Sequence, residues 1–370
     1  MKTTRLSLLL AGLASMAAGC QPETETLPTQ ESGSTLKAHE AKLDTPVGTW
    51  TSNASSLSEF SGHTVTLMRG TGNVLVTASG KAEVYNPYTD TWRRTASPLT
   101  LHTFHAATEL PSGKVLVTGG RDGSNLWTTS SELYDPDTET WSPTSPMLTP
   151  RSSHAATRLD SGKVLVVGGV VPQPWNGPLA EVYDPQTDTW SGVSGSFTPR
   201  SRIAQTELYS GKVLVTGGYT WWTSPAGDAS SEVNIYDPAT NSISPAGNLA
   251  RARHGHFAIR LYSGNVLIVG GIDGGSTVEI YDPYSGQWSL GPPFPFNTGI
   301  LFSATMLYSG EVLVTTIDFK AALYDPSTNT WIPTTPMKEV RSFTQTALLH
   351  TGEVLMVGGG PPRSVERFTR

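Results

Sequence analysis

Short apolar runs recur along the chain at nearly regular intervals. The central leucines of successive runs are 41, 49, 49, 53, 46 and 42 residues apart. Runs this short and rich in Val are typical of buried strands rather than helices. A repeat of about 40 to 50 residues fits the four-stranded blade of a β-propeller. We therefore predict seven blades, whose apolar runs are centred on Leu75, Leu116, Leu165, Leu214, Leu267, Leu313 and Leu355.

The same signals surround each run. The run itself is continuously apolar, as expected of a strand buried between two neighbouring blades. In five units a Gly pair follows it, where the missing Cβ lets another strand or ring approach closely. A Tyr-Asp-Pro turn then ends the expected third strand, because Pro fixes φ and Asp offers an acceptor to the turn. The expected fourth strand carries a Trp that fills the space between blades, at Trp92, Trp141, Trp190, Trp288 and Trp331.

The order Gly-Gly, Tyr and Trp at these spacings resembles the Kelch repeat. The resemblance covers the chain from Pro46 to the C-terminus. It implies an all-β fold, a seven-bladed Kelch β-propeller built from four-stranded antiparallel blades. It does not determine the activity, since Kelch propellers serve both as enzymes and as binding platforms.

The two ends of the repeated region complement each other. The last unit stops after Val365-Glu366-Arg367-Phe368 and has no fourth strand, whereas an extra strand, Gly48-Thr49-Trp50-Thr51, precedes the first unit. We expect this N-terminal strand to become the fourth strand of the C-terminal blade, which closes the ring and removes exposed sheet edges. Residues 46–370 would then form one propeller domain.

The N-terminal segment carries a processing signal. Lys2 and Arg5 precede an apolar stretch, and small residues lead to Cys20, the only cysteine. This resembles a bacterial lipoprotein signal, which implies that residues 1–19 are removed and that Cys20 is lipidated. Residues 20–45, rich in Glu, Thr, Ser and Pro, are expected to form a flexible tether. We expect attachment to the bacterial envelope, at the outer membrane, through this lipid alone. An ordinary secretory signal, which would give a secreted protein, is the alternative.

Charge and composition exclude several function classes. A net charge of −6 and a pI near 5.8 argue against nucleic acid as a partner. One cysteine allows neither an intrachain disulfide nor a Cys-based zinc site. Galactose oxidase resembles the expected fold and has a copper site with a tyrosine crosslinked to cysteine. Because Cys20 belongs to the signal, that chemistry is excluded. No nucleophile elbow, phosphate loop or H-E-x-x-H helix is present, so we expect no cofactor and no catalytic residue.

The longest expected loops lie on adjacent blades. Between the Gly pair and the Tyr, blades 2, 3 and 4 have 13, 13 and 17 residues, and the other blades have at most nine. These loops also carry aromatic residues that the repeat does not require. Such residues suit stacking on sugar rings or anchoring a protein partner. Their alternative role is to cover the tops of the blades and pack against nearby prolines. The residues are Trp127, Trp175, Tyr219, Trp221 and Trp222.

Arginines form a second candidate set. Arg151, Arg200 and Arg253 stand just before inner strands, and Arg121 stands in a long loop. An anionic ligand over the mouth of the channel could use them as bidentate donors. The Kelch resemblance implies an alternative, in which arginines before the first strand bond carbonyls between blades.

Histidines recur at one register of the inner strands. Histidines from several blades could bind a metal. However, a seven-bladed channel is too wide for the four to converge on one ion, and the remaining blades have Ile203, Phe302 and Thr344 at this position, so we expect no metal site. The four are His63, His105, His154 and His256.

The sequence therefore favours a non-catalytic, envelope-anchored binding module. We expect a monomer that recognises a carbohydrate or a surface protein through the loop face over blades 2–4. The alternative is a sugar-active enzyme, similar to an epimerase or an oxidase, with its pocket at the mouth of the channel. Convergent carboxylates in a deep pocket would favour the enzyme, and a shallow aromatic rim would favour binding.

Overall fold

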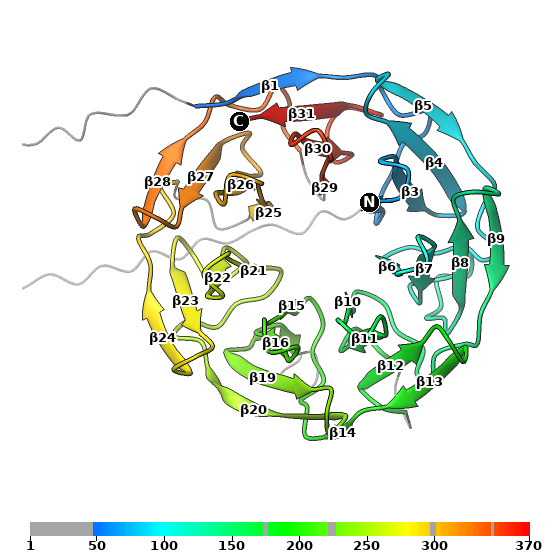
Figure 1. Cartoon of the computed structure of the whole chain (residues 1–370), viewed down its shortest axis with the longest axis horizontal. Helices are drawn as coiled ribbons and strands as arrows, with labels where there is room; N and C mark the ends of the chain where they lie inside the picture. The colour runs from blue at the N-terminus through cyan, green and yellow to red at the C-terminus, as the bar shows by residue number, and fades with distance from the viewer. Residues whose placement is uncertain (1–46, 173–176, 221–226, 297–300, 342–343) are drawn as a thin grey trace, which may run out of the picture. The chain divides into compact units, whose positions relative to one another are not determined.

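The computed structural model describes residues 47–172, 177–220, 227–296, 301–341 and 344–370, with only the backbone of residues 301 and 302. Seven blades of four antiparallel strands surround one axis, and the sheet of one blade carries a short fifth strand (Figure 1). This confirms the predicted seven-bladed, all-β propeller. The described residues include no helix long and apolar enough to cross a membrane.

Each blade runs from an inner strand beside the axis to an outer strand at the rim (Figure 1). Blade 1 contains β2 (Thr64–Leu67), β3 (Val74–Ala78), β4 (Lys81–Asn86) and β5 (Thr91–Arg94). Blade 2 contains β6 (Ala106–Glu109), β7 (Val115–Thr118), β8 (Ser131–Asp135) and β9 (Thr140–Pro143). Blade 3 contains β10 (Ala155–Arg158), β11 (Val164–Val167), β12 (Ala180–Asp184) and β13 (Thr189–Gly192).

Blade 4 contains β15 (Ala204–Glu207), β16 (Val213–Thr216), β19 (Glu232–Asp237) and β20 (Ser242–Asn248). It also carries β14 (Ser194–Gly195), parallel to β20, and a loop hairpin of β17 (Tyr219–Thr220) and β18 (Asp228–Ala229). Blade 5 contains β21 (Phe257–Arg260), β22 (Val266–Val269), β23 (Val278–Asp282) and β24 (Gln287–Leu290). Blade 6 contains β25 (Leu301–Met306), β26 (Val312–Thr316), β27 (Ala321–Asp325) and β28 (Thr330–Pro333).

Blade 7 joins the two ends of the propeller. It contains β29 (Gln345–Leu348), β30 (Val354–Val357), β31 (Val365–Thr369) and, as its outer strand, β1 (Thr49–Ser52). β1 pairs antiparallel with β31, and Trp50 stands opposite Phe368 (Figure 1). This is the closure predicted from the orphan N-terminal strand.

The described core consists of seven apolar layers, one between each pair of adjacent blades. Between blades 1 and 2, for example, Leu75 and Val84 pack with Val115 and Tyr134. The second strand of every blade is buried along its whole length. Burial on both faces explains why these runs are continuously apolar rather than alternating.

The Gly pairs pack closely against the loops that lead into the inner strands. A Cβ on Gly119 would lie 2.6 Å from the carbonyl oxygen of Arg151, in the loop of the next blade. A Cβ on Gly120 would lie 2.6 Å from the carbonyl oxygen of Thr103, in the loop of its own blade. Their φ angles, 59° and 95°, also favour glycine. The close approach predicted from the sequence is therefore an approach to loop backbone on two sides.

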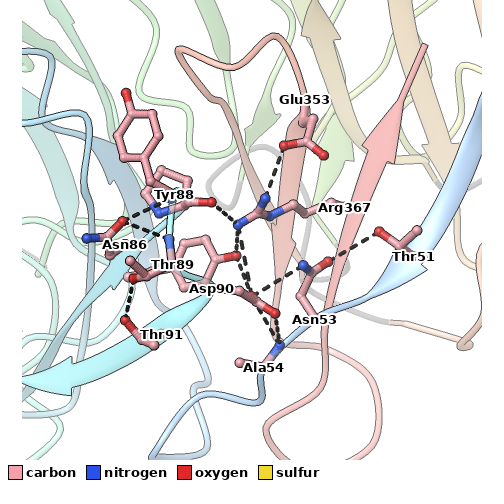
Figure 2. Close-up of polar contacts among 12 residues, drawn as sticks. Thr51, Asn53, Ala54, Asn86, Tyr88, Thr89, Asp90, Thr91, Glu353 and Arg367 are labelled. Carbon is pink, nitrogen blue, oxygen red and sulfur yellow. Dashed lines mark hydrogen bonds and ion pairs between the residues drawn. The ribbon is translucent and has the colours of Figure 1, made fainter.

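The seam between blades 7 and 1 contains a buried arginine, Arg367 on β31, which is 8% exposed. Its guanidinium donates to the phenol of Tyr85 in blade 1. It also donates to Glu353 Oε2 in blade 7, at 3.1 Å (Figure 2). Asp90 of blade 1 lies beside it and accepts the backbone N–H of Ala54, which follows β1, at 3.1 Å. The N-terminal and C-terminal strands thus meet at one turn of blade 1.

Candidate functional site

The loops between blades reach the inner strands at one opening of the central channel. We call this opening the mouth and define it by the residue two positions before each of the first five inner strands. Two adjoining cavities of about 310 and 360 Å³ lie there, both lined by Phe104 and Ser153. Arg202 lines the larger one. The mouth therefore has room for a small polar ligand or for side chains of a partner. Its five residues are Gly62, Phe104, Ser153, Arg202 and Gly255.

A belt of backbone hydrogen bonds connects these five residues. The N–H of Phe104 donates to the carbonyl of Gly62 at 3.0 Å, and the next three residues repeat the bond at 2.8, 3.2 and 2.9 Å. All five have left-handed backbone, with φ between 51° and 62°. The belt therefore imposes this conformation, which glycine adopts readily and other residues rarely do.

Three blades place a side chain where the other two have glycine. Phe104, Ser153 and Arg202 belong to blades 2, 3 and 4. The side chain of Phe104 is 48% exposed. Arg202 is exposed too, and its guanidinium makes no hydrogen bond or ion pair with any other described residue. An aromatic ring and a guanidinium thus stand at the mouth on these adjacent blades.

Sequence reasoning missed Phe104 and Ser153 as site residues. The available signal is their alignment with Gly62 and Gly255, one residue before the recurring histidine. Glycine at this register in two units indicates a positive φ in all of them. Read this way, the phenylalanine and the serine are conspicuous exceptions.

Arg121 and Trp127 lie together beside Phe104. Arg121 exchanges backbone hydrogen bonds with Thr103 at 2.8 and 3.1 Å. Its guanidinium lies 5.0 Å from the ring centroid of Trp127 and donates to Asn125 Oδ1 at 3.0 Å. Both side chains are half-buried. The structure therefore joins two of the predicted ligand residues into one cation–π pair at the rim.

Tyr219 occupies the equivalent position in blade 4. It exchanges backbone hydrogen bonds with Ser201, next to Arg202, at 2.8 and 3.0 Å. Its half-buried ring lies 4.8 Å from the ring of His254. The remaining predicted rim aromatics, Trp175, Trp221 and Trp222, lie outside the described residues.

The other predicted ligand arginines lie in the interior. Arg151 is fully buried and donates to the carbonyls of Gly168 and Pro178 at 2.7 Å and to Glu181 Oε1 at 2.6 Å. Arg253 makes the equivalent bonds in blade 5. Each arginine thus connects the loop that carries it to the loop between the second and third strands of its own blade. The family resemblance had implied bonds between blades instead. A ligand at the surface does not reach these guanidinium groups.

Arg200 is the third interior arginine. It donates to Glu232 Oε2 at 2.7 Å and to Asn234 Oδ1 at 2.5 Å, and burial lowers its pKa to about 10. Its guanidinium remains protonated at neutral pH. Arg200 therefore holds β19 of blade 4 against the loop that carries Arg202, and acts on the mouth only through that packing.

Comparison with known proteins agrees with this geometry. The Kelch motif model matches residues 103–148 and 254–295, which hold blades 2 and 5. The match covers these two stretches, and the seven blades establish the fold. The chain is a seven-bladed β-propeller that contains Kelch motifs. No curated protein matches its sequence.

Among solved structures, this propeller resembles a fungal alcohol oxidase in complex with copper. The two chains are 21% identical, with a TM-score of 0.70 over 87% of this chain and 76% of that one. At this identity the resemblance shows a shared fold and carries no activity from one protein to the other.

The histidines contact the blade before their own. Three of them bond to a threonine near the end of the second strand of that blade, and His63 bonds to the carbonyl of Val357. Between blades 3 and 4 the same positions hold Val167 and Ile203, which pack together. The histidines therefore serve inter-blade contact. The Nε2 to Oγ1 distances are 2.9 Å for His105–Thr77, 3.0 Å for His154–Thr118 and 2.8 Å for His256–Thr216.

Burial lowers the pKa of these histidines. The pKa of His63 falls to about 4, and a hydrogen bond to the carbonyl of Val357 partly opposes the shift. The pKa values of His105 and His256 fall to about 3. All three are therefore neutral at pH 7. Within the described ranges, no group of three or more His, Cys, Asp or Glu side chains is placed to share a metal ion.

Proposed function

We propose that this propeller is a non-catalytic binding module that takes a carbohydrate or a surface protein on its loop face over blades 2–4. The observation that carries the proposal is the residue type at the left-handed positions of the mouth. Blades 1 and 5 have Gly62 and Gly255, whereas blades 2, 3 and 4 have Phe104, Ser153 and Arg202.

Stability alone favours glycine at these positions. A non-glycine residue held in left-handed backbone costs on the order of 1–2 kcal/mol. Phe104 also keeps 48% of its side chain in water, and Arg202 is exposed. The fold accepts glycine here, as Gly62 and Gly255 demonstrate. Contact with a ligand explains side chains that cost stability and gain little within the molecule.

The chemistry of the rim suits both ligand classes. The ring of Phe104 offers a flat apolar face, and Arg202 offers several N–H donors to hydroxyl, carbonyl or carboxylate oxygens. Arg121 with Trp127 and the ring of Tyr219 extend the same surface toward the loops of blades 2 and 4. Aromatic rings interspersed with arginine are typical of carbohydrate-stacking surfaces and of protein hot spots.

The lining of the mouth favours binding over catalysis. The described residues that line its two cavities include no Asp or Glu. A sugar-active enzyme would need a proton donor and acceptor there. The histidines that line these cavities are engaged with the preceding blade or have a lowered pKa. The shallow aromatic rim is therefore the better supported site.

The envelope location rests on the sequence of residues 1–45. Lys2, Arg5 and the small residues before Cys20 support a lipid anchor with a tether of about 25 residues. Fractionation of cells that express a Cys20→Ala variant tests the anchor. We expect the variant in the soluble fraction, and its retention in the membrane would contradict lipidation at Cys20.

Replacing the strained side chains by glycine tests the binding site. A Phe104→Gly/Arg202→Gly variant removes two costs of left-handed backbone, so its melting temperature should stay the same or rise by a few degrees. Binding to the ligands found with a glycan array and an envelope-protein pull-down should weaken at least tenfold, or about 1.4 kcal/mol. Leu290→Ala, an exposed change outside the mouth, is the matched control. Unchanged binding by the glycine variant would refute the site.

A further inference from the structure

A row of exposed tyrosines lies on the face opposite the mouth. This face carries the turns between the first and second strands and those between the third and fourth. Tyr209, Tyr262 and Tyr308 stand in first-to-second turns of blades 4, 5 and 6, and Tyr88 and Tyr284 in third-to-fourth turns of blades 1 and 5. Their exposed fractions range from 53% to 75%. We call these five tyrosines, with the exposed His350 of blade 7, the tyrosine arc.

The arc is continuous from one blade to the next. The ring of Tyr209 would lie 3.2 Å from a Cβ on Gly264, in the turn that carries Tyr262. The ring of Tyr262 would lie 3.3 Å from a Cβ on Gly310, in the turn that carries Tyr308. Tyr308 approaches Gly352 of blade 7 in the same way. His350 and Tyr88 both approach Gly72 of blade 1. The surface therefore extends through blades 4, 5, 6, 7 and 1.

Packing between turns does not account for the tyrosines. In blade 2, Pro111 occupies the same position and makes the same contact, 3.0 Å from a Cβ on Gly162. Blade 3 has Asp160 there and makes no such contact with Gly211. The fold therefore accepts a proline ring at this position, or no ring at all. The hydroxyls of Tyr209 and Tyr262 also donate to the carbonyls of Tyr262 and Leu307 in the next turns, at 3.5 and 3.4 Å. Even so, each tyrosine remains more than half exposed.

The charges on this face differ along the ring. Blades 2 and 3, outside the arc, and blade 4, at one end of it, carry Lys–Asp pairs at 2.9 to 3.0 Å. At the position of these lysines, blades 5 and 6 have Asn265 and Glu311. The carboxylate of Asp282 is bonded within its own turn, by Ser285 at 2.6 Å. Arg260 is stacked on Tyr209 at 4.3 Å. The arc therefore lacks the free cations that an anionic polymer requires.

We propose that the tyrosine arc is a second binding surface, independent of the mouth, for a neutral polysaccharide chain. The C–H faces of pyranose rings pack on exposed aromatic faces, and phenol groups exchange hydrogen bonds with sugar hydroxyls. One ring on each successive blade repeats the contact along a polymer, so several weak contacts add up through multivalency. The arc has no deep apolar pocket of the kind that centres a protein hot spot.

Affinity electrophoresis tests the proposal with the full-length protein. The gels contain a soluble β-glucan, an α-glucan or a mannan, with polygalacturonate as the anionic comparison. We expect retardation by at least one neutral polymer and none by polygalacturonate. A Tyr262→Ala/Tyr308→Ala variant should bind at least tenfold more weakly. A Tyr262→Trp/Tyr308→Trp variant, which keeps aromatic faces, should stay within about threefold of the wild type.

The controls distinguish this surface from the mouth. The Phe104→Gly/Arg202→Gly variant should be retarded like the wild type, so the two surfaces can fail independently. Thermal unfolding should show the alanine variant within a few degrees of the wild type, and Tyr284→Ala with Tyr88→Ala replaces it if it does not fold. The proposal is overturned if no neutral polymer retards the wild type or if the alanine variants are retarded equally. Retardation by polygalacturonate alone, or tyrosine-dependent self-association without polymer binding, would also overturn it.

Discussion

The seam that closes the ring differs from the other six. At each of those, the residue after the Glu position of the third strand is apolar and packs on the next blade. At the closing seam this residue is Arg367, whose guanidinium reaches Tyr85 and the carbonyl of Pro87. It also donates to Glu353 (Figure 2). A polar network thus replaces an apolar contact at one seam of seven. The apolar residues are Val84, Leu133, Val182, Ile235, Ile280 and Leu323.

The difference follows from chain connectivity. At every seam, including the one between blades 7 and 1, a loop joins the outer strand of one blade to the inner strand of the next. Inside blade 7, however, β31 and β1 come from distant parts of the chain, so the contacts themselves must set their register. Apolar packing is non-directional, whereas hydrogen bonds of a guanidinium are directional. We infer that Arg367 and Asp90 align the closing blade with blade 1.

Deleting residues 46–55 should have the largest effect. The deletion removes β1, uncovers the edge of β31 and removes Trp50, which is 3% exposed. Loss of a buried Trp alone costs about 3–5 kcal/mol, a large part of the stability of a typical domain. We expect the whole propeller to lose its cooperative thermal transition. Trp50→Ala is the control that separates loss of the indole side chain from loss of the whole strand. A melting temperature within a few degrees of the wild type would show that closure is dispensable.

Changes at Arg367 should have an intermediate effect. Arg367→Ala leaves a cavity and removes the partner of Glu353, so we expect a loss of about 2–4 kcal/mol in urea unfolding. Arg367→Leu makes the seam resemble the other six and should lose less, since an apolar side chain replaces a buried charge well. If the network sets the register, the leucine variant should refold with more oligomer in size-exclusion chromatography. Equal refolding yields of monomer would remove that role.

The fold was predictable because it repeats. Seven copies of one pattern average out local exceptions, and the unpaired strand at Trp50 could be matched to the incomplete last unit. The polar closing seam was not predictable in the same way. The sequence shows Arg367 at an apolar register, but which groups surround it depends on the turn of blade 1 that holds Asp90.

The candidate site was only partly predictable. Arg151 and Arg202 are the same residue type only a few positions from the same strand register, yet one is fully buried and the other exposed. The left-handed residue in each loop decides which side of the loop the arginine faces. Backbone angles cannot be read from residue type alone. Arg121 and Trp127 were found from loop length, because long loops on adjacent blades gather at one rim.

A change of pH should alter stability by the smallest amount per residue. Because histidines lie at both kinds of seam, this measurement compares the closing seam with the others directly. The unfolded pKa of His is about 6.5, and the folded values of His63 and His105 are about 4 and about 3. Between these values the unfolded state binds more protons, so stability should fall as pH decreases below about 6.5. Each histidine contributes at most about 1.4 kcal/mol per pH unit. His63, at the closing seam, should become protonated in the folded state first.

A paired substitution isolates one ordinary seam. Thr118→Val with His154→Ile copies the Val167–Ile203 pair that the propeller already contains between blades 3 and 4. Urea unfolding at pH 7 and at pH 4.5 should show nearly unchanged stability at the higher pH and a smaller loss at the lower one. If the variant loses as much stability in acid as the wild type, His154 does not contribute to the acid sensitivity of this seam.

The pairing of β1 with β31 has a consequence for how the protein is made. β1 has its partner strand some 320 residues later in the chain (Thr49 pairs with Thr369, and 369 − 49 = 320), so β1 stays unpaired until all intervening blades have been synthesised. A chain that stops before Val365 leaves β1 without a neighbour and exposes two sheet edges to proteases and chaperones. We therefore expect the pairing of β1 with β31 to be the step at which a nascent propeller gains resistance to proteolysis.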